Sequence, residues 1–220
     1  FNALFEYGSF NFLFALSGLG SILVGCLSNL SQWKLKRFLA FSSIVNLGYI
    51  LLFFSCGLLT KAAVFGILFN LLLYIVLMFS FFANFLVIRK AREFSVLTDI
   101  NELFSLKTSN RFLSMSLFIN MLSMAGVPPL LGFYGKFYLM SFLWLNSLWF
   151  SLIVVLVGSI LSAFYYIRIA RSLFNFTGSF LFLKQGDYFF NFLNIVFVLF
   201  QICFVFLLFY YLPIFFQVLS

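Results

Sequence analysis

The sequence predicts an all-α fold, a polytopic transmembrane helical bundle of about six crossings, one of them broken by proline. Hydrophobic residues make up 65% of the chain and charged residues only 8%, too few to cover a water-soluble surface. Apolar runs of about 20 residues recur along the chain, which is the length that a helix needs to cross the hydrocarbon core. A transmembrane β-barrel is excluded, because its strands alternate polar and apolar residues over segments of about 10.

The predicted helices follow one another in a single transmembrane domain that covers residues 1–220. The first is rich in glycine and serine, which let a neighbouring helix approach closely. The second has its polar residues in its first half, and the third is the most uniformly apolar. The longest polar stretch, 89–111, follows the third helix. The expected spans are about 10–30, 38–59, 62–88, 112–145, 148–174 and 188–216.

The fourth span, 112–145, is too long for one straight crossing and contains Val127-Pro128-Pro129, which an unbroken helix does not accept. It forms either two crossings or one discontinuous crossing. With one crossing, the basic groups at 34–37, 89–111 and 168–184 all fall on the same side of the membrane, and Lys61 lies opposite. The positive-inside rule therefore favours one crossing, broken at 127–129.

Lys136 is the candidate functional residue, because an ionisable group inside the membrane is costly and marks a transport pathway by default. It follows the Pro128-Pro129 break by about two helical turns, and Gly132 and Gly135 thin the helix beside it. Broken helices occur at membrane depth where the freed backbone groups are buried in protein or line a wet cavity. The alternative is a lysine that anchors a helix end at the interface.

Three single polar residues on apolar spans, Ser42, Asn46 and Asn70, are either interhelical hydrogen-bonding groups or parts of a polar path. Lys61, beside a turn, is predicted to be an ordinary interfacial lysine. The three cysteines are far apart and the chain has no histidine, so we expect no metal site.

No nucleophile with a base, no carboxylate pair and no cofactor motif is present, so covalent chemistry in this chain is not expected. The net charge of +8 comes from loop residues, which excludes nucleic acid as the expected partner. The 38 phenylalanines suggest the codon bias of a T-rich organelle genome.

Two motifs resemble those of the antiporter-like membrane subunits of respiratory complex I. Residues 121–140, MLSMAGVPPLLGFYGKFYLM, are similar to the signature around that family's broken helix. Gln32, Lys36 to Ile44 and Asn46 to Tyr49 resemble its motif QxxxKRLLAYSSIxHxGY, and Arg168 after Tyr165-Tyr166 is similar to the subunit 2 branch. The matches run in family order from about residue 15 to 175.

The resemblance implies a proton-pumping subunit of NADH:ubiquinone oxidoreductase, built from two inverted repeats and a final helix, of which this chain resembles only the second half. Lys136 then corresponds to a proton-relay position. The resemblance also implies other complex I membrane subunits as partners, including an adjacent antiporter-like subunit, together with lipids. FMN, iron–sulfur clusters and ubiquinone are expected elsewhere in the complex and no cofactor in this chain. The implied location is the mitochondrial inner membrane, with the basic loops on the matrix side.

Two departures from the family pattern shape the expectation. Asn46 stands where the family often has histidine, so a titrating role at that position is absent. The helices of the first repeat are not in the sequence, so we expect a split subunit, with a separate chain supplying the N-terminal half. The alternatives are a structural membrane-arm subunit that does not pump and a subunit of a cation/proton antiporter complex.

Overall fold

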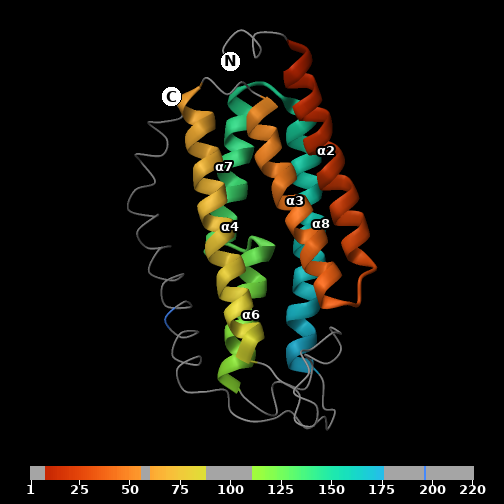
Figure 1. The fold of residues 1–220 in the computed structure, drawn as a ribbon, viewed down its shortest axis with the longest axis vertical. Coiled ribbons are helices and arrows are strands. Elements are labelled where there is room, and N and C mark those ends of the chain that lie inside the picture. Colours follow the sequence, from red (N-terminus) through yellow and green to blue (C-terminus); the bar gives the residue numbers. More distant parts are fainter. Residues whose placement is uncertain (1–7, 56–59, 88–110, 176–195, 197–220) are drawn as a thin grey trace.

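The computed structural model describes residues 8–55, 60–87, 111–175 and Val196, and these form a bundle of helices aligned with its longest axis (Figure 1). The predicted last helix, 188–216, lies outside the described residues except for Val196, as does the polar stretch 89–110. The helices are α2 (Gly8–Leu30), α3 (Leu35–Ser55), α4 (Lys61–Val87), α6 (Arg111–Ala125), α7 (Leu131–Leu145) and α8 (Trp149–Asn175).

Four of these helices, α2, α3, α4 and α8, are long and apolar enough to cross a membrane. The protein is therefore a multi-pass, all-α membrane protein, as the sequence predicts. The start of α3 at Leu35 is three residues earlier than the expected span, so Lys36 and Arg37 lie in its first helical turn.

Helices α6 and α7 are the two halves of one broken crossing. Each has 15 residues, and at about 1.5 Å per residue neither reaches across a hydrocarbon core of about 30 Å. They follow one another along the bundle axis, α6 in the lower half of Figure 1 and α7 in the upper half. The break between them, 126–130, includes the predicted 127–129 and a cis peptide bond between Pro128 and Pro129.

The helix order places most of the described cations at one end of the bundle. Helix α3 begins and α8 ends at the lower end of Figure 1, which holds Lys36, Arg37, Arg168 and Arg171. Lys61, at the start of α4, lies at the opposite end and is exposed. This is the distribution expected for a single broken crossing.

Two apolar clusters fill the bundle, one above the other. The lower cluster joins α3, α4, α6, the first turn of α7 and α8 around Phe38, Phe81 and Leu117. The upper cluster joins α2, α3, α4, α7 and α8 around Ile22, Phe53 and Leu139.

A buried polar seam fixes the half-helix α6 to α4. The Ser80 hydroxyl donates a 2.8 Å hydrogen bond to Asn120 Oδ1, and the Ser116 hydroxyl donates to Asn84 Oδ1. The Asn84 amide also donates to the Ser80 carbonyl at 3.0 Å. Asn84 and Asn120 are both fully buried. Because an unpaired amide in an apolar core is costly, this seam specifies how α6 sits on α4.

Close packing of α2 on α3 depends on glycine. A Cβ added at Gly48 would come within 2.9 Å of the Gly18 carbonyl oxygen and 2.7 Å of Ile22 Cγ1. Gly20, on the same pair of helices, faces open space with nothing within 4 Å.

Gly48→Ala is therefore expected to destabilise the bundle by about 1–3 kcal/mol, the usual cost of overpacking. Gly20→Ala is the matched control, because it gains the same helix propensity without a clash. Thermal unfolding of the purified protein in detergent measures both. Equal midpoints for the two variants would contradict the packing described here.

Candidate functional site

The end of α6 is a glycine-terminated turn set inside the bundle. Gly126 adopts a left-handed conformation with φ 84°. Its N–H donates to the Ser123 carbonyl at 3.1 Å, and the Val127 N–H donates to the Leu122 carbonyl at 3.3 Å. This pair of bonds is the Schellman motif, which satisfies two of the four carbonyls that a helix leaves without intrahelical donors at its C-terminus. The carbonyls of the last two residues of α6 remain.

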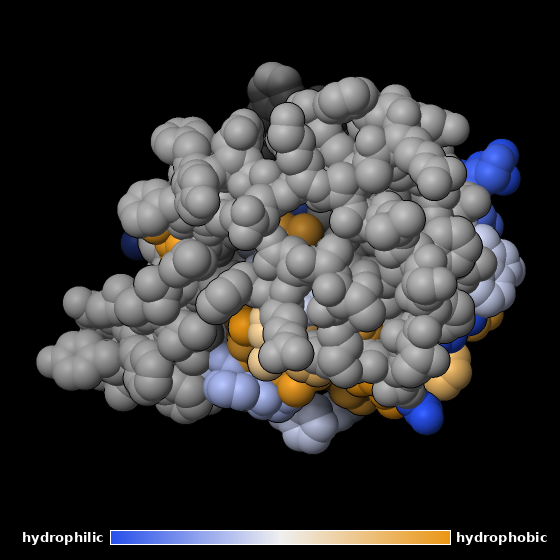
Figure 2. All heavy atoms as spheres, turned by 90° about the horizontal axis from the view of Figure 1, so that it is seen from below, coloured by the Kyte–Doolittle hydropathy of each residue, from blue (hydrophilic) through white to orange (hydrophobic). Residues whose placement is uncertain are grey.

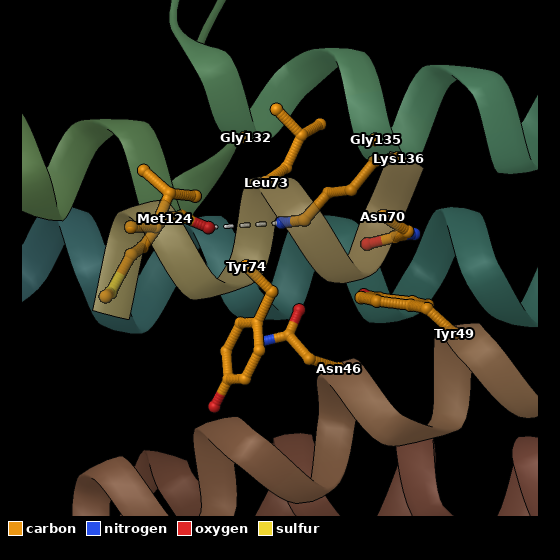
Figure 3. Close-up of a pocket in the computed structure, with 10 residues that line it drawn as sticks. Asn46, Tyr49, Asn70, Leu73, Tyr74, Met124, Gly132, Gly135 and Lys136 are labelled. Carbon is orange, nitrogen blue, oxygen red and sulfur yellow. Dashed lines mark hydrogen bonds between the residues drawn. The ribbon is translucent and has the colours of Figure 1, made fainter. Parts of the chain in front are cut away.

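Lys136 provides the donors for those last two carbonyls. Its Nζ lies 2.9 Å from the Ala125 oxygen and 3.5 Å from the Met124 oxygen, so α7 reaches back to the end of α6 (Figure 3). The C-terminus of a helix carries partial negative charge, which favours a cation there. The end of α6 thus acts as the counter-charge for Lys136.

Ser162 of α8 is the third partner of Lys136. The ammonium donates to the Ser162 hydroxyl oxygen at 2.8 Å, and that hydroxyl donates to the Ser159 carbonyl at 2.8 Å. The Tyr49 hydroxyl of α3, itself buried, lies near Ser162. Three helices and the break therefore meet at one amino group.

Gly132 and Gly135 make the approach of α7 possible. A Cβ on Gly132 would overlap the Ser123 carbonyl oxygen of α6, and one on Gly135 would lie 3.4 Å from Asn70 Oδ1 of α4. The first glycine lets the halves of the broken crossing touch, and the second leaves room between α7 and α4. Pro128 and Pro129, within the break, are exposed.

A small cavity lies beside Lys136, lined by Asn46, Tyr49, Asn70 and Tyr74 among others (Figure 3). Its volume of about 30 Å³ has room for about two water molecules, since each needs about 10–15 Å³ by the same measure. The Asn70 amide nitrogen is buried and has no hydrogen-bond partner among the described residues. The cavity is therefore polar enough, and large enough, to hold water.

These polar groups form a layer between the two apolar clusters. On α4, α7 and α8 the polar residue stands between a member of the lower cluster and a member of the upper one, and on α3 Asn46 directly follows Val45, the first α3 residue of the upper cluster. On α4, for example, Asn70 lies between Ile67 and Leu73, and on α7 Lys136 lies between Tyr134 and Tyr138. The layer contains Asn46, Asn70, Lys136 and Ser162.

The structure brings together most, but not all, of the residues singled out in the sequence. Lys136, Asn46 and Asn70 line one cavity. Ser42 lies apart from it, because its hydroxyl is hydrogen-bonded to Tyr166 of α8, although its carbonyl accepts a 3.1 Å bond from the Asn46 amide. The roles assigned to these residues stay predictions.

Gly126 and Ser162 belong to the site and were not among the predicted residues. Gly126 could have been predicted as the end of a helix, since a glycine shortly before proline is typical of a helix C-terminus. Nothing in the sequence distinguishes Ser162, because it is one of several serines on an apolar helix. Within the described ranges, no group of three His, Cys, Asp or Glu side chains could hold a metal ion.

Comparison with protein families matches residues 1–162 to the NADH:quinone oxidoreductase/Mrp antiporter transmembrane family. NADH-ubiquinone oxidoreductase chain 2 of Arabidopsis thaliana is 35% identical over 175 residues, 78% of this chain and 34% of the relative. NADH-quinone oxidoreductase subunit N of Pelagibacter ubique is 31% identical over 156 residues, 71% of this chain and 32% of the relative. The matched part thus spans about a third of the length of these curated relatives.

Solved structures show the same fold. A chain of respiratory complex I from Thermus thermophilus with bound aureothin superimposes with a TM-score of 0.71 at 26% identity, covering 91% of this chain and 44% of that one. A chain of the Mrp complex from Dietzia superimposes with a TM-score of 0.62 at 18% identity, covering 81% of this chain and 32% of that one, which supports the fold alone. The family match and the relatives agree, and the chain belongs to the NADH:quinone oxidoreductase/Mrp antiporter family of membrane subunits.

Proposed function

We propose that this chain forms the second repeat of a complex I subunit 2 and that Lys136 relays protons in it. The observation that carries the proposal is the position of the lysine, which bridges the two halves of a broken crossing beside a polar cavity. The names of the relatives, chain 2 and subunit N of NADH oxidoreductases, support this branch of the family over a cation antiporter.

The surroundings of Lys136 suit both of its protonation states. The ammonium donates to two backbone carbonyls and one hydroxyl. A neutral amine has a lone pair and one fewer donor, and the Ser162 hydroxyl can turn to donate to it, because a hydroxyl is both donor and acceptor. Water in the cavity beside Asn70 would carry the released proton away from the amine. The redox groups of such a complex, FMN, iron–sulfur clusters and ubiquinone, would lie in other subunits.

The proposed location is the mitochondrial inner membrane, with the basic end of the bundle on the matrix side. Two features support it, the gathering of cations at one end of the helices and the phenylalanine-rich composition. A separate polypeptide would supply the first repeat and dock at the repeat boundary.

Lys136→Gln is expected to lower the number of protons translocated per electron in the reconstituted complex, because the relay group is lost. Lys136→Arg is the sharper variant: a guanidinium keeps the charge and the hydrogen bonds to α6 but does not release its proton. It should assemble and still pump poorly, while Lys61→Gln should behave as the unmodified protein. If Lys136→Arg translocates as many protons per electron as the unmodified protein, Lys136 acts only as a structural cation.

Ser162→Ala is expected to slow the rate of proton translocation by the reconstituted complex by about tenfold or more. The reason is that a hydrogen bond to a charged group contributes about 1.5–3 kcal/mol. Ser162→Thr, which keeps the hydroxyl, should restore it. Ser159→Ala on the same helix is the control, since its hydroxyl binds only the Leu156 carbonyl within the described structure. Equal loss in the two alanine variants would contradict a positioning role for Ser162.

The two-polypeptide arrangement is tested by intact-mass analysis of the native particle. We expect Lys136 and the first repeat on different chains of a particle that also contains the flavin and iron–sulfur subunits. A single chain that carries both would rule out the split subunit and leave the relay role untouched.

A further inference from the structure

The polar seam between α4 and α6 runs through the half of the bundle that leads from the basic end to Lys136. Its first pair joins Asn84, three residues before the end of α4, to Ser116, five residues after the start of α6. Its second pair, Ser80 with Asn120, lies about one helical turn further into the bundle. Figure 2 views the basic end and shows hydrophilic side chains at its margin. The seam therefore begins close to this end and is directed toward the lysine.

Ser123 continues the seam along α6. Ser116, Asn120 and Ser123 follow one another at spacings of four and three residues, so they lie on one face of the helix. Ser123 is fully buried, and its hydroxyl oxygen has no hydrogen-bond partner among the described residues. A buried hydroxyl without a hydrogen bond is costly, and ordered water commonly supplies the missing bond in protein interiors. The seam thus ends at a group whose natural partner is water.

The inner end of the seam adjoins the cavity beside Lys136. A Cβ on Gly132 would overlap the Ser123 carbonyl oxygen and would lie 3.6 Å from Leu77 Cδ1, and both Gly132 and Leu77 line the cavity. On α4, Leu77 lies three residues from Ser80, so the two share one face of that helix. Ser123 and Leu77 therefore lie where the seam and the cavity meet.

The side chains of the seam can pass protons without holding a charge. All five, Ser80, Asn84, Ser116, Asn120 and Ser123, are neutral, so a metal cation would find no counter-charge among them. A serine hydroxyl and a water molecule each accept one hydrogen bond while donating another, which is the requirement for a proton to move along a chain of such groups. The asparagine amides can hold water in place by donating to it or accepting from it.

We propose that the polar seam, Ser123 included, is the route by which protons enter from the basic end and reach Lys136 through bound water. Ser123 binds the water that joins the seam to the cavity, and each arriving proton passes to the neutral amine of Lys136. The route rests on the relay role proposed for that lysine. It adds the side of entry and the residues that form the path, which the relay role alone does not specify.

X-ray radiolysis of the assembled complex tests whether water reaches Ser123. Hydroxyl radicals formed from water oxidise the side chains that touch it, and mass spectrometry of this chain measures the oxidation at each position. Ser123→Cys places a reactive thiol at the inner end of the seam. Met121→Cys is the matched control, because Met121 is fully buried in the lower apolar cluster two residues away. We expect several-fold more oxidation at position 123 than at position 121, and equal oxidation would overturn the proposal.

A second substitution tests the side of entry. In the Ser123→Cys background, Asn84→Leu removes the amide at the outer end of the seam and should lower the oxidation at position 123 several-fold. Ser116→Val tests the same pair if Asn84→Leu does not assemble. Asn146→Leu is the control, because this amide lies at the opposite end of the bundle and donates to the Phe142 carbonyl of its own helix. Oxidation at position 123 that is unchanged by the seam variants would show that water arrives from the cavity alone, and would overturn the proposal.

Proton translocation by the reconstituted complex separates the route from the relay role. Ser123→Val, which removes the hydroxyl and fills its space, is expected to lower the translocation rate several-fold. Normal translocation by Ser123→Val beside poor translocation by Lys136→Arg would overturn the route and leave the relay role standing. Full translocation by Lys136→Arg would overturn both.

Discussion

The hydrogen bonds of Lys136 to the end of α6 are the interaction on which the site depends. A backbone carbonyl without a donor in hydrocarbon costs several kcal/mol, so a helix that stops halfway across a membrane must have every terminal carbonyl satisfied. Here the glycine turn satisfies two and the lysine the other two. The left-handed Gly126, the missing side chain of Gly132 and the long side chain of Lys136 all follow from this requirement.

Much of the fold could be predicted from the sequence, because membrane thickness sets helix length and proline sets the break. The position and hydrogen bonds of the Lys136 side chain could be predicted only in part. The sequence shows that a lysine follows a break, but it does not show that the lysine bends back to Met124 and Ala125. The sequence does not distinguish one serine on an apolar helix from another. Ser42 is hydrogen-bonded to Tyr166 and Ser162 to Lys136, and the rotation of each helix in the bundle determines which partner each serine faces.

The polar layer gives the bundle two cores in place of one. The lower cluster holds α6 and the first turn of α7 against α3, α4 and α8, and the upper cluster holds the rest of α7 against α2, α3, α4 and α8. The halves of the broken crossing are thus packed against partly different partners, and α6 is further fixed to α4 by the Asn84 and Asn120 seam. Lys136 lies where the two cores meet, and its bonds to Ala125 and Ser162 add polar contacts among α6, α7 and α8 at that level.

The contact between Lys136 and α6 is also short in sequence, spanning only 11 and 12 residues. A lysine near the middle of a transmembrane segment opposes insertion by about 2.5–3.5 kcal/mol on translocon scales. In this segment the carbonyls that accept from the lysine belong to the same broken crossing as the lysine. The broken crossing therefore carries hydrogen-bond acceptors for its own ammonium group, which offset part of the cost of placing that charge in the membrane.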